Sequence, residues 1–236
     1  PAILVNITLT QAIISTLTVF LAFLLYQRFL PSFWAVSASL LTASSPHLIN
    51  MNIYVLSETL FTFLCILTLL LFTLYHQQQK HFILFLASLA LGAATLTRPS
   101  LQFFILPMLL MLYIYEPVKG RIRAIAILAL GFIFIIGPWH IRNLVSTGEF
   151  SNNTLKIGFL HHGMYPGFRY QDQPESTGFP YRYDPNSAEI SKDIPAVLKE
   201  IKRRFTDEPA QHLYWYLIGK PVQFWSWNIV QGMGDV

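Results

Sequence analysis

The fold is decided by residues 56–100, which read "LSETLFTFLCILTLLLFTLYHQQQKHFILFLASLALGAATLTRPS". Two nearly unbroken apolar runs lie here, and the charged residues are confined to Glu58, Lys80 and Arg98. A helix that crosses a hydrocarbon core of roughly 30 Å needs about 20 predominantly apolar residues. The segment therefore predicts two consecutive membrane helices that place Glu58 and Arg98 on the same side of the bilayer.

The same pattern covers the first 141 residues. The 236-residue chain is 53% hydrophobic and 12% charged, whereas an average soluble domain is roughly 25% charged. Its few early charges separate six apolar segments, at 1–27, 29–57, 59–79, 81–97, 99–115 and 124–141. We expect residues 1–141 to form a bundle of about six transmembrane helices, the second of them short or broken near Pro46.

The remaining chain is much more polar. Residues 142–208 are expected to form a loop-rich segment with one amphipathic helix near 192–206, capped by Ser191. The apolar positions of that helix recur at helical spacing: Ile194, Val197, Leu198, Ile201 and Phe205. A further membrane or interfacial helix is expected at 209–230. The predicted class is an all-α polytopic membrane protein with about six to seven transmembrane helices.

The basic residues between the apolar segments predict the orientation. Five of them fall on one side if every segment crosses once, namely Arg28, Lys80, Lys119, Arg121 and Arg123. Only Arg98 occupies a short loop on the other side. Because short loops rich in Lys and Arg stay cytoplasmic, we expect a multi-pass protein of a bacterial inner or plasma membrane whose polar segment is non-cytoplasmic. The net charge of +4 then reflects topology, and no basic cluster interleaved with aromatic residues indicates nucleic acid.

Ionisable groups beside the hydrocarbon are costly and therefore functional candidates. Glu58 and Arg98 are two such groups. Two simpler interpretations stay open: Ser57 and Glu58 suit the cap and first turn of a helix, and Arg98 suits a snorkelling interfacial residue.

Taken together, the cations on the non-cytoplasmic side indicate a site for a lipid phosphate. Arg98, Arg142 and Lys220 are predicted to form a cationic collar, since guanidinium forks match phosphate geometry. Helix N-termini at Ser57 and Pro99 would add dipole ends that attract anions. His140 and Asn143 lie beside Arg142 and are candidate substrate-binding residues.

A divalent metal is the cofactor to consider. His161 and His162 are adjacent, which would put them on opposite sides of an extended backbone, so they are a weak metal pair. Glu58 is the candidate third ligand. The single cysteine, Cys65, excludes a disulfide framework and a thiolate zinc site.

Three motifs carry a resemblance to a known family. They are Ser-Glu-Thr at Glu58, Thr-Arg-Pro at Arg98, and Pro-Trp-x-x-Arg-Asn ending at Arg142 and Asn143. In this order the sequence resembles GT-C glycosyltransferases of the protein mannosyltransferase and aminoarabinose transferase type, over roughly residues 10–165. The resemblance implies a membrane transferase that moves a sugar from a polyprenyl-phosphate carrier to a lipid, glycan or protein acceptor.

The resemblance also implies roles for particular residues. Arg98 and Arg142 would stabilise the leaving phosphate, and Glu58 would orient the acceptor or help to hold a metal. The family's catalytic Asp lies in a loop after its first membrane helix, so we expect this chain to be a fragment that lacks that loop and is inactive alone.

Two other classes of function stay open on the sequence. A secondary transporter or lipid flippase also places ionisable residues near helix ends, although such sites usually lie near the bilayer midplane. A non-catalytic membrane assembly subunit would keep the fold without the catalytic acid.

Overall fold

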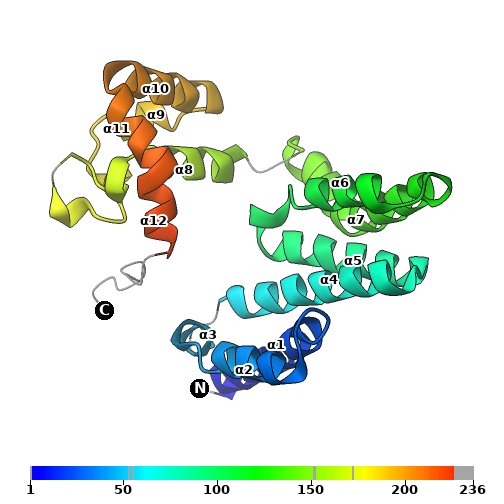
Figure 1. Ribbon diagram of the computed structural model, residues 1–236. Coiled ribbons are helices and arrows are strands. Elements are labelled where there is room, and N and C mark those ends of the chain that lie inside the picture. Colours follow the sequence, from blue (N-terminus) through cyan, green and yellow to red (C-terminus); the bar gives the residue numbers. More distant parts are fainter. Residues whose placement is uncertain (1, 53, 55, 151–152, 172, 226–236) are drawn as a thin grey trace. The chain divides into compact units, whose positions relative to one another are not determined.

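The computed structural model describes residues 2–52, 54, 56–150, 153–171 and 173–225 (Figure 1). The chain divides into two compact units, Pro1–Arg142 and Asn143–Val236, and each has a hydrophobic core of its own. Throughout the described ranges the regular structure is helical, with no strand. The predicted all-α class is confirmed.

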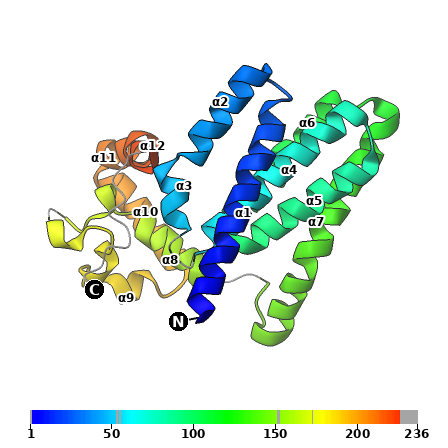
Figure 2. The same cartoon turned by 90° about the horizontal axis from the view of Figure 1, so that it is seen from below.

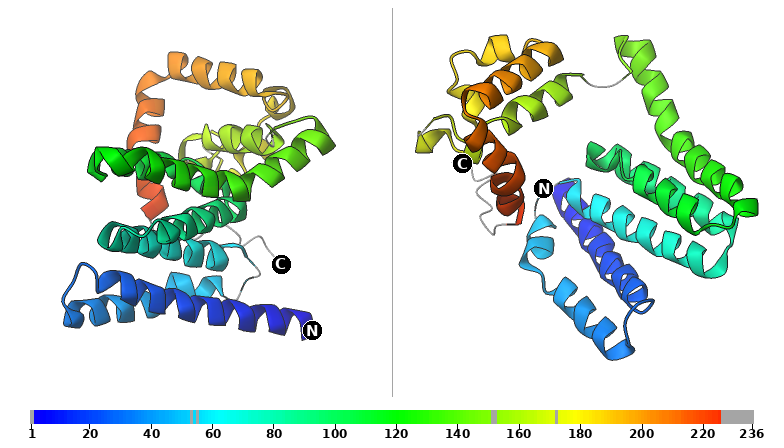
Figure 3. Two further views of the ribbon diagram at one scale, coloured as in Figure 1. Left: turned by 90° about the vertical axis from the view of Figure 1, so that its right-hand side faces the viewer. Right: turned by 45° about the horizontal axis from the view of Figure 1, so that its top comes forward.

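The first unit is built from long apolar helices arranged in layers (Figure 3). Helices α1 and α2 form one layer, α4 and α5 the next, and α6 and α7 the third. The bounds are α1 Ala2–Tyr26, α2 Ser32–Ala43, α3 Pro46–Met51, α4 Glu58–Gln78, α5 His81–Thr97, η1 Pro99–Leu101, α6 Ile105–Tyr115 and α7 Val118–Thr147.

Three of these helices are long and apolar enough to cross a membrane: Leu4–Tyr26, Glu58–Gln78 and Val118–Thr147. Three shorter apolar helical segments accompany them, at Ser32–Ala43, His81–Thr97 and Pro99–Tyr115. Many large apolar side chains on these helices are exposed to the surroundings of the unit, for example Phe82, Ile122 and Phe134. A chain with such an apolar exterior on spanning helices is a membrane protein.

Small residues let α5 and α7 approach closely. A Cβ added at Gly92 would come within 2.7 Å of Ile135 Cβ, and one added at Gly131 would overlap Ser88 Oγ. Close packing at small residues is a common way to associate helices in lipid, where the hydrophobic effect between helices is weak. The hydrophobic core of this unit contains residues from four helices, α4, α5, α6 and α7. They are Phe72, Tyr75, Leu84, Ala87, Leu91, Met108, Leu112, Ala124 and Leu128.

Two polar contacts join α1 to α4, one at each end of the helix pair. Arg28, just after α1, donates a 3.5 Å hydrogen bond to Gln77 near the end of α4. Gln11, in the first half of α1, donates to the Leu56 carbonyl ahead of α4. Helices α1 and α4 therefore run parallel, start beside start and end beside end (Figure 2).

The segment expected to span at 99–115 is not one continuous α-helix. Pro99 opens a 3₁₀ turn of three residues, and α6 begins only at Ile105. The helix expected at 124–141 instead runs from Val118 to Thr147 and contains Pro138. It therefore includes the bases that we expected in a loop, as well as the Pro-Trp-x-x-Arg-Asn motif.

The second unit is a set of shorter helices around its own core. Its elements are α8 Asn153–Gly163, η2 Pro166–Phe168, η3 Pro174–Ser176, η4 Pro180–Arg182, α9 Ser187–Ile190, α10 Ile194–Asp207, α11 Pro209–Tyr214, η5 Trp215–Gly219 and α12 Lys220–Trp225. Met164, Tyr165, Ile190 and Val197 form the buried core. Helix α8 occupies a stretch that we expected to be loop.

Helix α10 is amphipathic, but details of the sequence prediction are wrong. Its cap is Asp193 and not Ser191, because the Asp193 side chain accepts a 2.8 Å hydrogen bond from the Ala196 amide. Val197 and Ile201 face the core of this unit, whereas Leu198 is exposed. The apolar side of α10 is therefore packed within the second unit.

The last apolar segment is short and irregular within the described residues. Helix α11 gives way at Trp215 to a π-helical turn that ends at Gly219, where an added Cβ would come within 2.7 Å of the Trp215 ring. Trp215 is buried, and its Nε1 donates to the Gly163 carbonyl at 3.1 Å. Residues 226–230 of the expected helix lie outside the described residues.

Candidate functional site

An ion pair between Glu58 and Arg98 lies at one end of the first unit. Glu58 is the first residue of α4, and Arg98 follows the last residue of α5 with an extended backbone (φ −145°, ψ 120°). Arg98 Nη1 donates to Glu58 Oε1. The α4–α5 hairpin thus brings together two residues 40 positions apart, as its apolar runs predict.

The pair leaves part of the guanidinium open. The Arg98 side chain is 41% exposed and that of Glu58 22% exposed. The Arg98 guanidinium also lies over the Phe61 ring, 5.9 Å from its centroid, which favours one orientation through a cation–π contact. A guanidinium has five N–H donors in a fixed fork, so Arg98 can hold Glu58 and still present donors to an anion.

The sequence offered helix capping as a simpler role for Ser57 and Glu58. Ser57 occupies the N-cap position of α4, but its side chain makes no capping hydrogen bond. The Glu58 carboxylate still lies in the first turn, where the helix dipole favours an acid. Its specific partner is nevertheless Arg98.

The helix N-terminus expected at Pro99 is a wrong prediction. Pro99 starts only the 3₁₀ turn, and the N-cap of α6 is Phe104. A helix dipole accumulates over aligned peptide units, so this turn supplies little attraction for an anion. Arg98 itself is therefore the main positive group that this part of the chain contributes.

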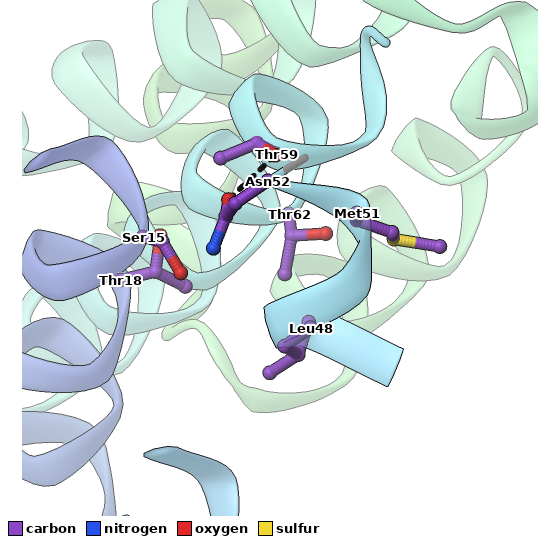
Figure 4. A pocket seen from close by; sticks show the side chains of 7 residues that line it. All are labelled: Ser15, Thr18, Leu48, Met51, Asn52, Thr59 and Thr62. Carbon is purple, nitrogen blue, oxygen red and sulfur yellow. Dashed lines mark hydrogen bonds between the residues drawn. The ribbon is translucent and has the colours of Figure 1, made fainter. Parts of the chain in front are cut away.

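A small polar cavity lies near the start of α4 (Figure 4). It has a volume of about 10 Å³ and is lined by Ser15, Thr18, Leu48, Met51, Asn52, Thr59 and Thr62. Thr59 Oγ1 donates to Asn52 Oδ1 at 3.0 Å and so ties α4 to the residue after α3. Such a volume admits about one water molecule, so it cannot hold a sugar or a phosphate.

The third motif lies within the last turns of α7. His140 is half-buried and packs edge-to-face with Trp139, with ring centroids 5.1 Å apart. Arg142 is exposed, and Asn143 is half-buried. The part that Arg142, Asn143 and His140 play in binding a substrate stays a prediction.

The two adjacent histidines lie on a helix and not on an extended backbone. His161 and His162 occupy the last turn of α8. His161 Nε2 shares a 3.0 Å hydrogen bond with the Tyr165 hydroxyl, and His162 packs edge-to-face against Tyr181 at 5.6 Å. Burial lowers the pKa of both imidazoles.

These surroundings favour a packing role for the histidines. Among the residues that the structure describes, no three His, Cys, Asp or Glu side chains are grouped so that they could hold a metal ion. Glu58 belongs to the first unit and both histidines to the second. A metal site made of Glu58, His161 and His162 therefore stays a prediction.

A buried polar network in the second unit was missed by the sequence reasoning. Tyr165 donates a 2.7 Å hydrogen bond to Asp184, and Arg204 pairs with Asp184 at 3.1 Å and with Glu200 at 2.8 Å. The Arg204 guanidinium also covers the Tyr165 ring at 4.5 Å. Hydrogen bonds from Arg203 and Arg204 lower the pKa of Glu200 to about 2.

Lys220 lies against the end of α8. Its Nζ is 4.3 Å from the Tyr216 ring centroid and would meet a Cβ at Gly163 at 2.8 Å. A cation next to a helix C-terminus is stabilised by the helix dipole. Burial nevertheless lowers the pKa of the Lys220 ammonium, and its role in binding phosphate stays a prediction.

Comparison with known proteins identifies the family. The family model described as dolichyl-phosphate-mannose-protein mannosyltransferase matches residues 4–141. No curated protein and no solved structure gives a match. The matched range holds the apolar helices, Glu58, Arg98 and His140, which confirms the GT-C resemblance seen in the motifs. The chain belongs to the dolichyl-phosphate-mannose-protein mannosyltransferase family, whose members are membrane glycosyltransferases.

Proposed function

We propose that the full-length protein transfers a sugar from a polyprenyl-phosphate carrier to an acceptor on the non-cytoplasmic side of the membrane. The observation that carries this proposal is the Glu58–Arg98 ion pair, which lies at the end of the apolar hairpin within the family match. A phosphate at the head of a lipid would meet Arg98 at the edge of the apolar helices. A free soluble anion would gain nothing from the apolar surface beside it.

The reaction that we propose is a displacement at the anomeric carbon. A hydroxyl or amine of the acceptor attacks that carbon, the bond from the carbon to the carrier phosphate oxygen breaks, and the carrier leaves as a phosphate monoester. The acceptor proton passes to a general base, a role that the resemblance gives to the family's catalytic Asp. Negative charge grows on the leaving oxygen. Arg98, with Arg142, would stabilise that charge, and preorganised electrostatics of this kind is usually the largest contribution to catalysis.

Glu58 is proposed as a positioning residue for Arg98. Its Oε1 already accepts from the guanidinium, and Arg98 keeps a substantial exposed fraction beside that bond. A carboxylate that holds one side of an Arg fork fixes the direction of the remaining donors. The other oxygen, Oε2, is buried and has no hydrogen-bond partner among the described residues, so orientation of the acceptor or metal binding, the roles first expected for Glu58, would use that oxygen.

The orientation is part of the proposal and has its own test. In the full-length protein with Cys65 replaced by Ser, a cysteine introduced at the exposed Glu189 should react with a membrane-impermeant maleimide added from outside intact cells. A cysteine at Lys119 should react only after the cells are opened. The opposite labelling pattern would overturn the orientation.

The transfer itself is tested with the full-length protein in lipid nanodiscs. Polyprenyl-phosphate sugars are supplied as donors, and release of polyprenyl phosphate is measured. Arg98→Ala should slow the release by about 100-fold, the cost typical of removing one stabilising donor.

The matched control is Arg28→Ala, an arginine of the same unit at its opposite end. It should change the rate less than about twofold, because its contact with Gln77 is exposed. If Arg98→Ala and Arg142→Ala both keep wild-type turnover and donor affinity, the two arginines do not bind the carrier phosphate and the proposal is wrong.

A further inference from the structure

The second unit contains a polar cleft to which the proposed reaction assigns no role. It has a volume of about 580 Å³, within the range of roughly 300–1,000 Å³ common for ligand sites. Its walls come from the turn at η2, from the residues ahead of α9, and from α10 and α11. The lining residues that matter for its chemistry are Tyr170, Asn186, Gln211 and the ion-paired group Asp184, Glu200, Arg203, Arg204 and Asp207.

Most charged groups of this cleft are paired with one another, and the two others that line it, Arg169 and Glu208, have opposite charges. Arg203 pairs with Glu200 and with Asp207, each at 2.7 Å. Arg204 pairs with Glu200 at 2.8 Å and with Asp184 at 3.1 Å. An anionic ligand would meet four carboxylates here, and a cationic ligand would meet three arginines. The arrangement therefore disfavours a strongly charged ligand of either sign.

A neutral hydroxyl group faces no such penalty. An ionised carboxylate has about four lone-pair sites, so a carboxylate held by arginine can still accept a hydrogen bond from a ligand. A hydroxyl can donate to a carboxylate and accept from an amide N–H, which suits a wall that combines carboxylates with side-chain amides. The cleft is thus matched to a ligand with many hydroxyls and no net charge.

Uncharged groups complete the wall. Asn186 and Gln211 are exposed, and within the described residues no hydrogen bond engages either side-chain amide. Each amide offers two donors and one acceptor oxygen. Tyr170 is half-buried, is held edge-to-face by Tyr165 at 6.3 Å, and lines the same cleft. Its ring gives an electron-rich face on which the C–H side of a sugar ring can pack.

We propose that this cleft binds a neutral sugar unit, and that this unit belongs to the acceptor. The acceptor would then be a glycan or a molecule that already carries one. The role of the cleft in recognising the acceptor rests on the proposed function, whereas the binding of a sugar by the cleft does not. Donor binding is left to the first unit, where the family match lies.

Sugar binding by the cleft is tested in the absence of a sugar donor. Saturation-transfer NMR is recorded on the full-length protein in phosphatidylcholine nanodiscs with maltose, lactose and mannobiose as neutral probes, and with glucosamine 6-phosphate as a charged probe. We expect saturation transfer to at least one neutral disaccharide and at least a fivefold weaker signal with the charged probe. The variant Asn186→Ala/Gln211→Ala should reduce the neutral signal at least fivefold, as should Tyr170→Ala.

The matched control changes two exposed residues of the same unit that do not line the cleft, Glu189→Ala/Lys192→Ala. This control variant should keep the wild-type signal. The unfolding temperature of Asn186→Ala/Gln211→Ala should be unchanged, which would show that the loss of sugar binding is not caused by unfolding. The proposal is overturned if no neutral probe binds, if the cleft variant binds as wild type does, or if the charged probe binds best.

The role of the cleft in recognising the acceptor is tested in the transfer assay with glycan acceptors. The variant Asn186→Ala/Gln211→Ala should raise the KM for the acceptor at least fivefold and leave the KM for the polyprenyl-phosphate donor within twofold of wild type. An increase confined to the donor KM would contradict a role of the cleft in recognising the acceptor. If sugars bind to the cleft but no donor is turned over, the cleft stands and the proposed function fails.

Discussion

The two units of this chain hold arginine in contrasting ways. In the first, Arg98 has Glu58 as its ion-pair partner, lies over Phe61, and keeps 41% of its side chain exposed. In the second, Arg204 binds both Asp184 and Glu200, covers the Tyr165 ring, and is only 18% exposed. Both are paired arginines, yet one has donors to spare and the other has its fork engaged.

This contrast separates a group that can act on a ligand from one that holds a fold. An arginine engaged by two carboxylates and a ring has little left to offer, and its loss leaves buried charges uncompensated. An arginine with one carboxylate partner at a partly exposed position contributes little to stability. Substitutions in the buried network of Arg204 should therefore change stability, and those at the Glu58–Arg98 pair should change activity.

The largest effect on stability is expected from Asp184→Ala. Asp184 is buried and accepts from both Tyr165 and Arg204, so its removal breaks a buried network at a cost of about 3–5 kcal/mol. The measurement is the unfolding free energy of the full-length protein in denaturant. The exposed Glu175→Ala is the control and should cost less than about 0.5 kcal/mol. An Asp184→Ala protein as stable as this control would mean that the network does not hold the unit together.

A smaller effect, on activity, is expected at Glu58. Glu58→Ala should lower the transfer rate roughly tenfold, because Arg98 loses its anchor and the bound phosphate loses alignment. Glu58→Gln keeps an acceptor oxygen for Arg98 and should recover most of that loss. Rate measurements on both variants with and without EDTA separate positioning from metal binding. Wild-type activity abolished by EDTA and restored by Mg²⁺ or Mn²⁺ would favour Glu58 as a metal ligand instead.

The smallest expected effect is a pH dependence of stability in the second unit. The pKa of Glu200 falls from near 4.5 to about 2 on folding, chiefly through the Arg203 hydrogen bond. A lowered carboxyl pKa contributes stability that is complete above the pKa of the unfolded chain and is lost as the pH falls through that of the folded chain. The unfolding midpoint should therefore drop between about pH 4.5 and pH 2. Comparison with Glu200→Gln isolates this carboxylate, and identical pH profiles for the two proteins would contradict the assignment.

The apolar helices and the placement of Glu58 and Arg98 on one side were predictable from the sequence for a simple reason, whereas their ion pair was not predicted. Charges are so scarce before residue 142 that the apolar runs between them mark the helices, and a hairpin of two such runs must bring Glu58 and Arg98 to one end. The break at Pro99 was not predictable in the same way, because a proline can begin an α-helix as readily as the 3₁₀ turn found in the structure.

The second unit was far less predictable. Tyr165, Asp184 and Arg204 come from three separate parts of the chain, and their contact depends on tertiary packing that no local periodicity encodes. Helix α8 contains Gly158 and has only a weak apolar stripe, so its sequence resembles loop. The cap of α10 was misplaced because Ser191 and Asp193 are both good N-cap residues, and only the backbone distinguishes them.

The most direct test is the dependence of the transfer rate on donor concentration in Arg98→Ala and Arg98→Lys. If Arg98 binds the carrier phosphate through its fork, Arg98→Ala should lower kcat/KM for the donor about 100-fold and keep the acceptor KM. Arg98→Lys should recover only part of this loss, because an ammonium cannot form the bidentate contact. Polyprenyl phosphate without sugar should inhibit the wild type more strongly than Arg98→Ala. Equal kcat/KM and equal inhibition in wild type and Arg98→Ala would contradict a phosphate site at Arg98.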